Sequence, residues 1–231
     1  MSKFGKLVLV PTPIGNLGDI TFRAVSVLKD ADIILAEDTR SAQTLLEAIK
    51  KRFALTVTCS TVWSYYKEKE FQKLPEIIDL LKQGKNISLI SEAGTPLVSD
   101  PGYLLVKTCI QKNIPITVIP GPSAITTALI YSGFNPQQHM FLGFFPKKES
   151  QILQLIDRLK QIKAIFPDMA FVFYESPLRI NQTLHYINIM KCNFEIVICR
   201  EMTRKFEEII RGPIDELIKR NYKGEITVVM K

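Results

Sequence analysis

Two polar stretches stand at the ends of apolar runs and hold side chains that could do chemistry. Glu37, Asp38 and Arg40 follow one such run. The loop 91–102, with the sequence SEAGTPLVSDPG, follows the run 86–90 and combines carboxylates and hydroxyls with two glycines and two prolines. Because there are only two histidines and four scattered cysteines, a Ser-His-Asp triad and a zinc site are poorly supported. The chemistry is therefore expected from carboxylates, hydroxyls, Lys and Arg, or from a bound cofactor.

Apolar runs predict the strands that must position these stretches. Continuous apolar runs of the kind that form buried strands lie at 7–10, 33–36, 86–90 and 116–119, with a shorter one at 56–59. Helical spacing between them predicts helices at 21–28, from about 41, at 70–83, 103–112 and 123–131. Strands that alternate with helices are typical of a parallel sheet, in which ligands bind beyond the carboxyl ends of the strands. The four polar residues 37–40 would point into that crevice. The alternative is an N-terminal cap for the helix from about Ser41, which its dipole would favour for the carboxylates; both can hold at once, and capping alone would explain Asp38 or Ser41.

Three loops rich in Gly and Pro are expected to meet at one end of this sheet. They follow the first, fourth and fifth strands, at 11–19, 91–102 and 120–124. Their backbone can approach a ligand closely, and the N–H groups at the helix start near Ser123 can receive a carboxylate. There is no Gly-x-Gly-x-x-Gly, so the dinucleotide fingerprint is absent. The coincidence favours a binding pocket over long turns held by their own Asp and Ser side chains.

The second half of the chain predicts a different α/β arrangement. We place a domain boundary at 135/136, which gives an N-terminal domain 1–135 and a C-terminal domain 136–231. Runs at 195–199 and 206–211 have no helix between them, so they predict an antiparallel pair. The predicted fold class is therefore α/β with two domains. The first has a mostly parallel sheet flanked by helices, and the second has a mixed sheet with helices.

Charge and hydropathy narrow the classes of partner. The chain of 231 residues carries a net charge of +7, which favours a polyanion such as nucleic acid, although many ordinary proteins are mildly basic. Aromatic residues interleaved with lysines near Trp63 could stack on bases, or anchor the following helix. The first apolar run is too short for a signal peptide, and no run is long enough to cross a bilayer. A cytoplasmic protein without a membrane partner is expected.

Seven motifs taken together are more specific than any one loop. In chain order they are PTPIGNL at 11–17, AEDTR at 36–40, AGTPLVSDPG at 93–102, PGPS at 120–123, FYES at 173–176, REMTRK at 200–205 and GE at 224–225. This combination resembles the ribosomal RNA small-subunit methyltransferase I family over essentially the whole chain. Members of that family methylate the 2′-hydroxyl of a cytidine in the decoding region, and their fold is that of the tetrapyrrole-methylase superfamily.

The resemblance implies a cofactor, a cleft and a partner. S-adenosylmethionine would bind between the two α/β domains of a homodimer, and small-subunit ribosomal RNA, in the assembled subunit, would be the substrate. By position, the implied cofactor-binding residues are Pro13, Gly15, Thr95, Pro96, Val98, Ser99, Asp100, Ser123, Ala124 and Tyr174. The chain departs from the family pattern at Glu92, where Asp is usual, and at 59–66, where a His-rich motif is common. It also ends at Lys231, without the family's C-terminal extension.

Methyl transfer to a ribose hydroxyl needs in-line positioning, and a nearby base or cation should help because the hydroxyl is a poor nucleophile. The candidates at the strand ends are Glu37, Asp38, Arg40, Glu175, Arg200, Glu201 and Lys205. Each could instead be an interdomain ion pair or a helix cap, and Arg40 and Lys205 could hold phosphate. No metal ligands are assigned. Two other functions stay open: methylation of a small planar, tetrapyrrole-like substrate, and RNA binding without catalysis.

Overall fold

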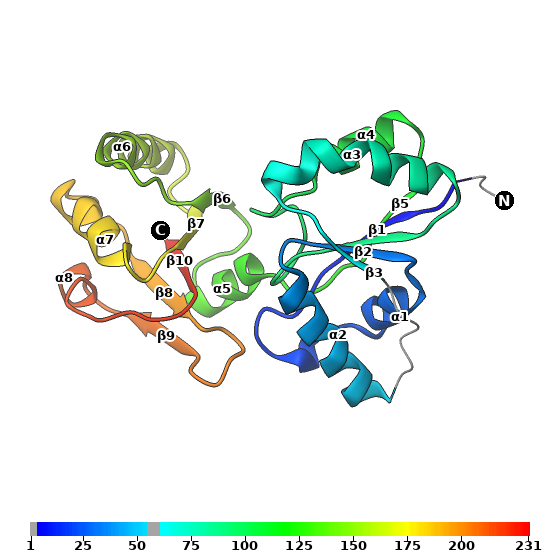
Figure 1. The fold of residues 1–231 in the computed structure, drawn as a ribbon. Coiled ribbons are helices and arrows are strands. Elements are labelled where there is room, and N and C mark those ends of the chain that lie inside the picture. Colours follow the sequence, from blue (N-terminus) through cyan, green and yellow to red (C-terminus); the bar gives the residue numbers. More distant parts are fainter. Residues whose placement is uncertain (1–3, 55–60) are drawn as a thin grey trace. The chain divides into compact units, whose positions relative to one another are not determined.

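The computed structural model describes residues 4–54 and 61–231 of the chain. These divide into two compact units, Met1–Ser123 and Ala124–Lys231 (Figure 1). The boundary predicted from the sequence lies at 135/136, so the two divisions differ by the helix α5 (Ala124–Ser132). That helix packs against strands of the second unit, which is why the structure groups it there. No helix in the described part of the chain has the length and apolar character needed to span a membrane.

The first unit is built on a five-stranded parallel sheet, as predicted. Its strands are β1 (Leu7–Val10), β2 (Ile33–Ala36), β3 (Thr61–Ser64), β4 (Ile87–Ile90) and β5 (Ile116–Val118), in the order β3-β2-β4-β1-β5. Its helices are η1 (Leu17–Asp19), α1 (Phe22–Asp30), α2 (Thr39–Phe53), α3 (Lys67–Lys82) and α4 (Tyr103–Gln111). The strand predicted at 56–59 lies outside the described residues, and β3 covers the segment around Trp63.

Alternation along β1 explains how the sheet is covered on both faces. Val8 and Val10 pack into one core with α1 and α2, whereas Leu7 and Leu9 pack into another with α3 and α4. Figure 1 shows the two helix pairs on opposite faces of the sheet. Burial on both faces accounts for the continuous apolar runs of the central strands. The fifth strand was expected to be buried as well, but β5 lies at the edge of the sheet, and Val118 is 55% exposed.

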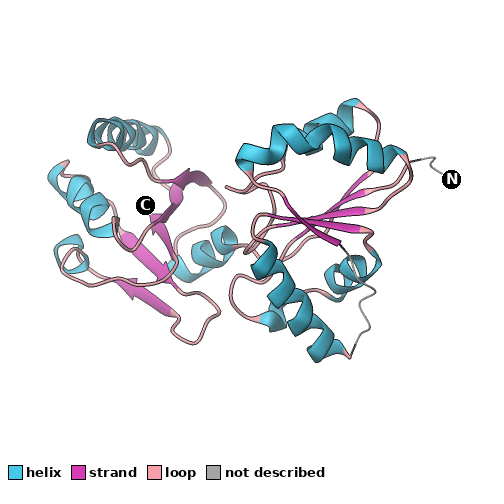
Figure 2. Cartoon of the chain, viewed as in Figure 1, coloured by secondary structure: helices cyan, strands magenta, loops and turns pink. Residues whose placement is uncertain are grey.

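The second unit has the mixed sheet that the sequence predicts. Its strands are β6 (His139–Phe144), β7 (Ala170–Glu175), β8 (Ile196–Arg200), β9 (Glu208–Arg211) and β10 (Ile226–Met230), in the order β6-β7-β10-β8-β9. Besides α5, its helices are α6 (Glu149–Ile165), α7 (Ile180–Ile189) and α8 (Ile214–Leu217), and Figure 2 distinguishes helices from strands. Only the β6–β7 pair is parallel, and β8 and β9 form the predicted antiparallel pair.

Pairing in this second sheet brings several chain segments to one end. Phe144, near the carboxyl end of β6, pairs with Tyr174 in β7. At the start of β10, Ile226 pairs with Glu175 on one side and with Arg200, the last residue of β8, on the other. The turns after β6, β7 and β8, and the chain leading into β10, therefore lie at the same end of the sheet.

Candidate functional site

Three Gly- and Pro-containing loops of the first unit follow three adjacent strands. Because β4, β1 and β5 are neighbours in the parallel sheet, the loops 91–102, 11–16 and 119–123 leave the sheet side by side. We call these three segments the three-loop cluster. The sequence predicted that they would share one end of the sheet, and the strand order confirms it.

Hydrogen bonds tie the first two loops of this cluster together. The backbones of Thr12 and Gly94 exchange two hydrogen bonds, of 2.9 and 3.0 Å. The Thr12 hydroxyl donates to the Ser91 carbonyl at 3.1 Å, and the Ser91 hydroxyl donates to the Gly94 carbonyl at 2.7 Å. Both hydroxyl-bearing residues are buried, so these bonds are shielded from competing water. The sequence analysis did not single out Thr12 or Ser91, since their role depends on the partner loop.

The third loop is held by close approach as well as by a hydrogen bond. The Thr95 hydroxyl donates to the Pro122 carbonyl at 3.2 Å. A Cβ atom at Gly121 would lie 2.9 Å from two carbons of Pro11, which is closer than packed carbon atoms come. Gly121 is therefore required here because its lack of a side chain lets the first and third loops touch.

The central loop contains unusual backbone conformations. Leu97 and Ser99 have φ values of 71° and 74°, although neither is a glycine. Such conformations cost about 1–3 kcal/mol each and persist only where the surroundings impose them, often at ligand sites. The helix that follows is also fixed, because the Glu70 carboxylate accepts bonds from the Leu104 amide at 2.9 Å and the Tyr65 hydroxyl at 3.1 Å. The start of α4, at the end of the loop, is thus tied to α3.

Carboxylates gather near this loop. Burial raises the pKa of Asp100 to about 6, and the charges of Glu37 and Glu92 raise it further in the same direction. Glu37 comes from the end of β2, which is the sheet neighbour of β4, so the strand order explains their proximity. A site with this charge favours a cation. The sequence predicted Glu37 and Asp100 as site residues, but only the fold shows that they act on one another.

Asp38 and Arg40 have different surroundings. Asp38 caps α2, accepting a 2.7 Å bond from the Arg40 amide, which is the capping role weighed in the sequence analysis. The Arg40 side chain is exposed, as is Glu37. Asp38 therefore positions the start of the helix, while Glu37 and Arg40 can meet a ligand.

The predicted cofactor residues fall in both units. Eight lie in or beside the three-loop cluster: Pro13, Gly15, Thr95, Pro96, Val98, Ser99, Asp100 and Ser123. Ala124 is the first residue of α5, and Tyr174 lies in β7, so these two belong to the second unit. For all ten residues a role in cofactor binding stays a prediction.

Glu175, at the end of β7, is engaged on both carboxylate oxygens. One oxygen pairs with the Arg179 guanidinium at 2.5 Å and accepts from the Ser176 amide at 2.7 Å, and the other accepts from the Thr183 hydroxyl at 2.7 Å. Its side chain is 0% exposed. Arg179 also donates to the carbonyls of Phe145 and Pro146, at 3.4 Å each. The pair therefore fastens the segment after β6 to the end of β7 within the second unit, which is a structural role other than the interdomain ion pair or helix cap considered from the sequence.

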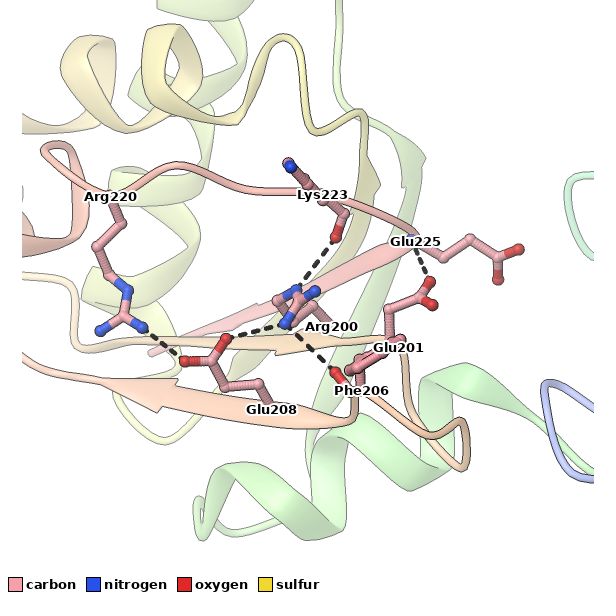
Figure 3. Close-up of polar contacts among 7 residues, drawn as sticks. All are labelled: Arg200, Glu201, Phe206, Glu208, Arg220, Lys223 and Glu225. Atoms are coloured by element: carbon pink, nitrogen blue, oxygen red, sulfur yellow. Dashed lines mark hydrogen bonds and ion pairs between the residues drawn. The ribbon is translucent and has the colours of Figure 1, made fainter.

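Arg200 and Glu201 hold the turn between β8 and β9 in place (Figure 3). Arg200 donates to the Lys223 carbonyl at 3.1 Å, the Phe206 carbonyl at 3.3 Å and the Glu208 carboxylate at 3.0 Å. The Glu201 carboxylate accepts from the Arg204 side chain at 3.1 Å and from the Glu225 amide at 2.9 Å. These contacts join three segments of the second unit.

Lys205 differs from the other candidates on this turn. Its ammonium lies 5.5 Å from the centre of the Phe206 ring, and both side chains are exposed. Of the candidate side chains after β7 and β8, Lys205 is therefore the one best able to reach a ligand.

Comparisons with known proteins agree with this geometry. The family model described as Tetrapyrrole (Corrin/Porphyrin) Methylases matches residues 6–218. The ribosomal RNA small subunit methyltransferase I of Hydrogenobaculum sp. (strain Y04AAS1) is 41% identical over 232 residues, which cover 97% of this chain and 95% of that protein. The protein of the same description from Thermotoga maritima is 40% identical over 230 residues, covering 98% of both chains. Among solved structures, diphthine synthase has the same fold, with a TM-score of 0.74, 15% identity and coverage of 98% of this chain and 90% of that one.

The chain is an α/β protein of two units, with Gly- and Pro-containing loops at the carboxyl ends of a parallel sheet. The relatives above match its sequence over nearly its full length. The chain belongs to the tetrapyrrole methylase family, in the group formed by the ribosomal RNA small subunit methyltransferases I. Membership makes it a methyltransferase that uses S-adenosylmethionine. This also explains the missing glycine fingerprint, since the three-loop cluster stands where a dinucleotide-binding loop would otherwise be.

Proposed function

We propose that this protein transfers a methyl group from S-adenosylmethionine to the 2′-hydroxyl of a cytidine in small-subunit ribosomal RNA. The observation that carries the proposal is the 41% identity with a ribosomal RNA small subunit methyltransferase I over 97% of this chain. The net charge of +7 supports a polyanionic substrate more than a small planar one.

The three-loop cluster fits the methyl donor. S-adenosylmethionine, when bound, supplies an electrophilic methyl group on a cationic sulfonium. Asp100 and Glu37 provide negative charge, which favours a cation and disfavours an anion at this position. Hydrogen bonds between the loops hold their backbone groups in place in advance, so little ordering is needed on binding.

The acceptor hydroxyl needs a group to receive its proton. A general base is most effective when its pKa lies near the working pH. The pKa of Asp100, raised to about 6, is closer to neutral pH than that of an ordinary carboxyl group. Glu37 is exposed and lies within the electrostatic reach of Asp100. We assign Glu37 and Asp100 as the carboxylates that hold the donor or the proton, and Arg40 and Lys205 as the cations for substrate phosphate. Asp38, Glu175, Arg200 and Glu201 are assigned as positioning residues.

A homodimer in the cytoplasm completes the proposal. The family resemblance supports a dimer, and an assembled small subunit as substrate would place the protein where ribosomes are assembled. Light scattering coupled to size-exclusion chromatography tests the dimer directly. A monomer mass at micromolar concentration would refute this part of the proposal while leaving the activity open.

Methyl transfer from labelled S-adenosylmethionine to small ribosomal subunits that lack this modification tests the function. We expect label on one cytidine ribose, located by nuclease mapping of the RNA. Subunits that already carry the modification are the matched control and should take up no label. If the protein binds S-adenosylmethionine but transfers no methyl group to the unmodified small subunits, the ribosomal assignment is overturned.

A further inference from the structure

One end of the second unit exposes two aromatic rings and three lysines. Phe144 is 61% exposed and Phe206 is 65% exposed, so each presents more than half of its surface to solvent. Lys147, Lys148 and Lys205 are exposed beside them in the sequence. The strand pairing brings the end of β6 and the β8–β9 turn to the same end of the sheet. We call these five residues the aromatic edge.

Contacts with β7 position the Phe144 side chain. Between Phe141 and Phe144 the register of β6 against β7 shifts, and Gly143 adopts a φ of 71°. This irregularity changes the direction in which the Phe144 side chain leaves the strand. The Phe144 ring then packs edge-on against the Tyr174 ring, with centroids 5.4 Å apart.

Phe206 is fixed through its backbone. The Arg200 guanidinium donates to its carbonyl at 3.3 Å (Figure 3). The turn carrying it is closed by a 2.6 Å bond from the Thr203 amide to the Glu207 carboxylate. The backbone that carries the ring is therefore ordered before a flat partner stacks on it, which lowers the entropic cost of binding.

Charge at this end is arranged to leave the lysines available. Four carboxylates here are paired with arginines: Glu175 with Arg179, Glu208 with Arg200 and Arg220, and Glu201 and Glu225 with Arg204. The Glu207 carboxylate instead accepts from the Tyr131 hydroxyl at 3.0 Å and from the Thr203 amide at 2.6 Å. Among the described residues, no ion pair involves the three lysines of the aromatic edge, so their positive charge faces solvent. Exposed rings beside unpaired cations match single-stranded nucleic acid, whose bases stack and whose phosphates pair with lysines.

We infer that the aromatic edge binds unpaired nucleotides of the RNA substrate, with Phe144 and Phe206 stacking on bases and Lys147, Lys148 and Lys205 contacting phosphates. This inference rests on the proposed function, because it assigns the surface that holds the RNA during methyl transfer. The occupant is RNA rather than a second copy of the chain, since a purely apolar interface would not need the lysines.

Binding of a fluorescein-labelled single-stranded RNA of about 12 nucleotides to the full chain, followed by anisotropy, tests the inference. Phe144→Leu and Phe206→Leu keep an apolar side chain but remove the flat ring, and each should raise Kd roughly five-fold or more. Phe206→Trp keeps a flat ring at this position, so its Kd should stay close to that of the wild type and below that of Phe206→Leu. The matched control is Phe166→Leu, because Phe166 is 46% exposed but precedes the opposite end of β7. We expect Phe166→Leu to leave Kd unchanged.

The lysines have a separate signature. Lys147→Gln, Lys148→Gln and Lys205→Gln should each reduce the slope of log Kd against log salt by about 0.7, the value for one phosphate contact on a single strand. Lys191→Gln, exposed and placed before the start of β8, should leave the slope unchanged.

Two further measurements separate this inference from the proposed function. If the wild-type protein methylates small subunits and the Leu variants bind RNA as well as it does, the aromatic edge is not the RNA surface. If the rings and lysines bind RNA but small subunits are not methylated, the inference stands and the ribosomal assignment fails. A change of molecular mass in Phe144→Leu or Phe206→Leu, with unchanged RNA affinity, would assign the edge to a protein interface and overturn the inference.

Discussion

The carboxyl ends of the parallel strands carry opposite charge arrangements in the two units. In the first, neighbouring carboxylates act on Asp100 and burial raises its pKa to about 6. In the second, arginines pair with four carboxylates, as in the Glu175–Arg179 and Glu208–Arg200 pairs, and Lys147, Lys148 and Lys205 are exposed. The first arrangement suits a cationic methyl donor and the second suits a polyanion. The same kind of sheet end thus suits different ligands in the two units, because the charges around it are compensated differently.

The largest effect is expected where the second unit neutralises a buried carboxylate. Glu175→Gln keeps the shape of the side chain but leaves the Arg179 guanidinium without its counter-charge. Breaking a buried pair in this way should lower the free energy of unfolding by about 3 kcal/mol. Urea denaturation measures it. Under conditions where the variant is folded, methyl transfer should persist; complete loss there would show that Glu175 acts in catalysis after all.

Asp100→Asn should have the opposite effect on stability. The folded chain holds the Asp100 proton up to about pH 6, against 3.8 ordinarily. Stability is therefore lost as pH rises from 3.8 through 6, because the unfolded chain ionises more easily. Asn has no charge to bury, so the variant should be more stable than the wild type by about 2 kcal/mol at neutral pH. Below pH 3.8, where Asp100 is protonated in both the folded and the unfolded chain, it should show no gain.

The same Asp100→Asn variant should bind S-adenosylmethionine more weakly. Hydrogen bonds to charged groups contribute about 1.5–3 kcal/mol, so calorimetry should show a loss of roughly ten-fold or more. Asp79→Asn is the control, since Asp79 is an exposed residue of α3 paired with Lys82 at 3.6 Å. A destabilised Asp100→Asn protein with normal cofactor affinity would contradict both parts of the prediction.

Comparing alanine substitutions at two glycines distinguishes the effect of backbone strain from that of contact between the loops. Gly94 and Gly84 have similar φ values, 80° and 92°, so alanine strains both alike. An added Cβ at Gly94 would lie 3.3 Å from Ile14, whereas Gly84 has open space around it. Gly94→Ala should therefore cost about 1 kcal/mol more than Gly84→Ala in thermal or urea unfolding. It should also weaken cofactor binding, and equal behaviour of the two variants would argue against a rigid three-loop cluster.

The smallest effect is expected from Arg200→Lys. A lysine cannot reproduce the three bonds of the guanidinium, so we expect a loss of about 1 kcal/mol. RNA affinity should fall with it, because the Phe206 carbonyl loses its donor. Arg158→Lys, on the exposed part of α6, should change neither quantity. A catalytic Arg200 would instead show normal RNA affinity with a reduced rate of transfer.

Periodicity and punctuation in the sequence were enough to predict most of the fold. The runs at 7–10, 33–36 and 86–90 became β1, β2 and β4 within one residue, because burial on both faces demands continuous apolar residues. The edge strand β5 was correctly located but wrongly expected to be buried. Burial depends on which neighbours a strand has, and the local sequence does not specify them.

The sequence by itself determined which loops could form a site, because in the stretches 11–19, 91–102 and 120–124 Gly permits backbone conformations that other residues rarely adopt and Pro fixes φ. It also carried the family resemblance. Only the tertiary structure decided which groups meet. The Thr12–Ser91 bond, the influence of Glu37 on Asp100 and the Thr183–Glu175 bond each join residues that lie eight or more positions apart in the sequence. Charge compensation acts through space, so the fold alone sets which carboxylates remain negative and which lysines remain free for a ligand.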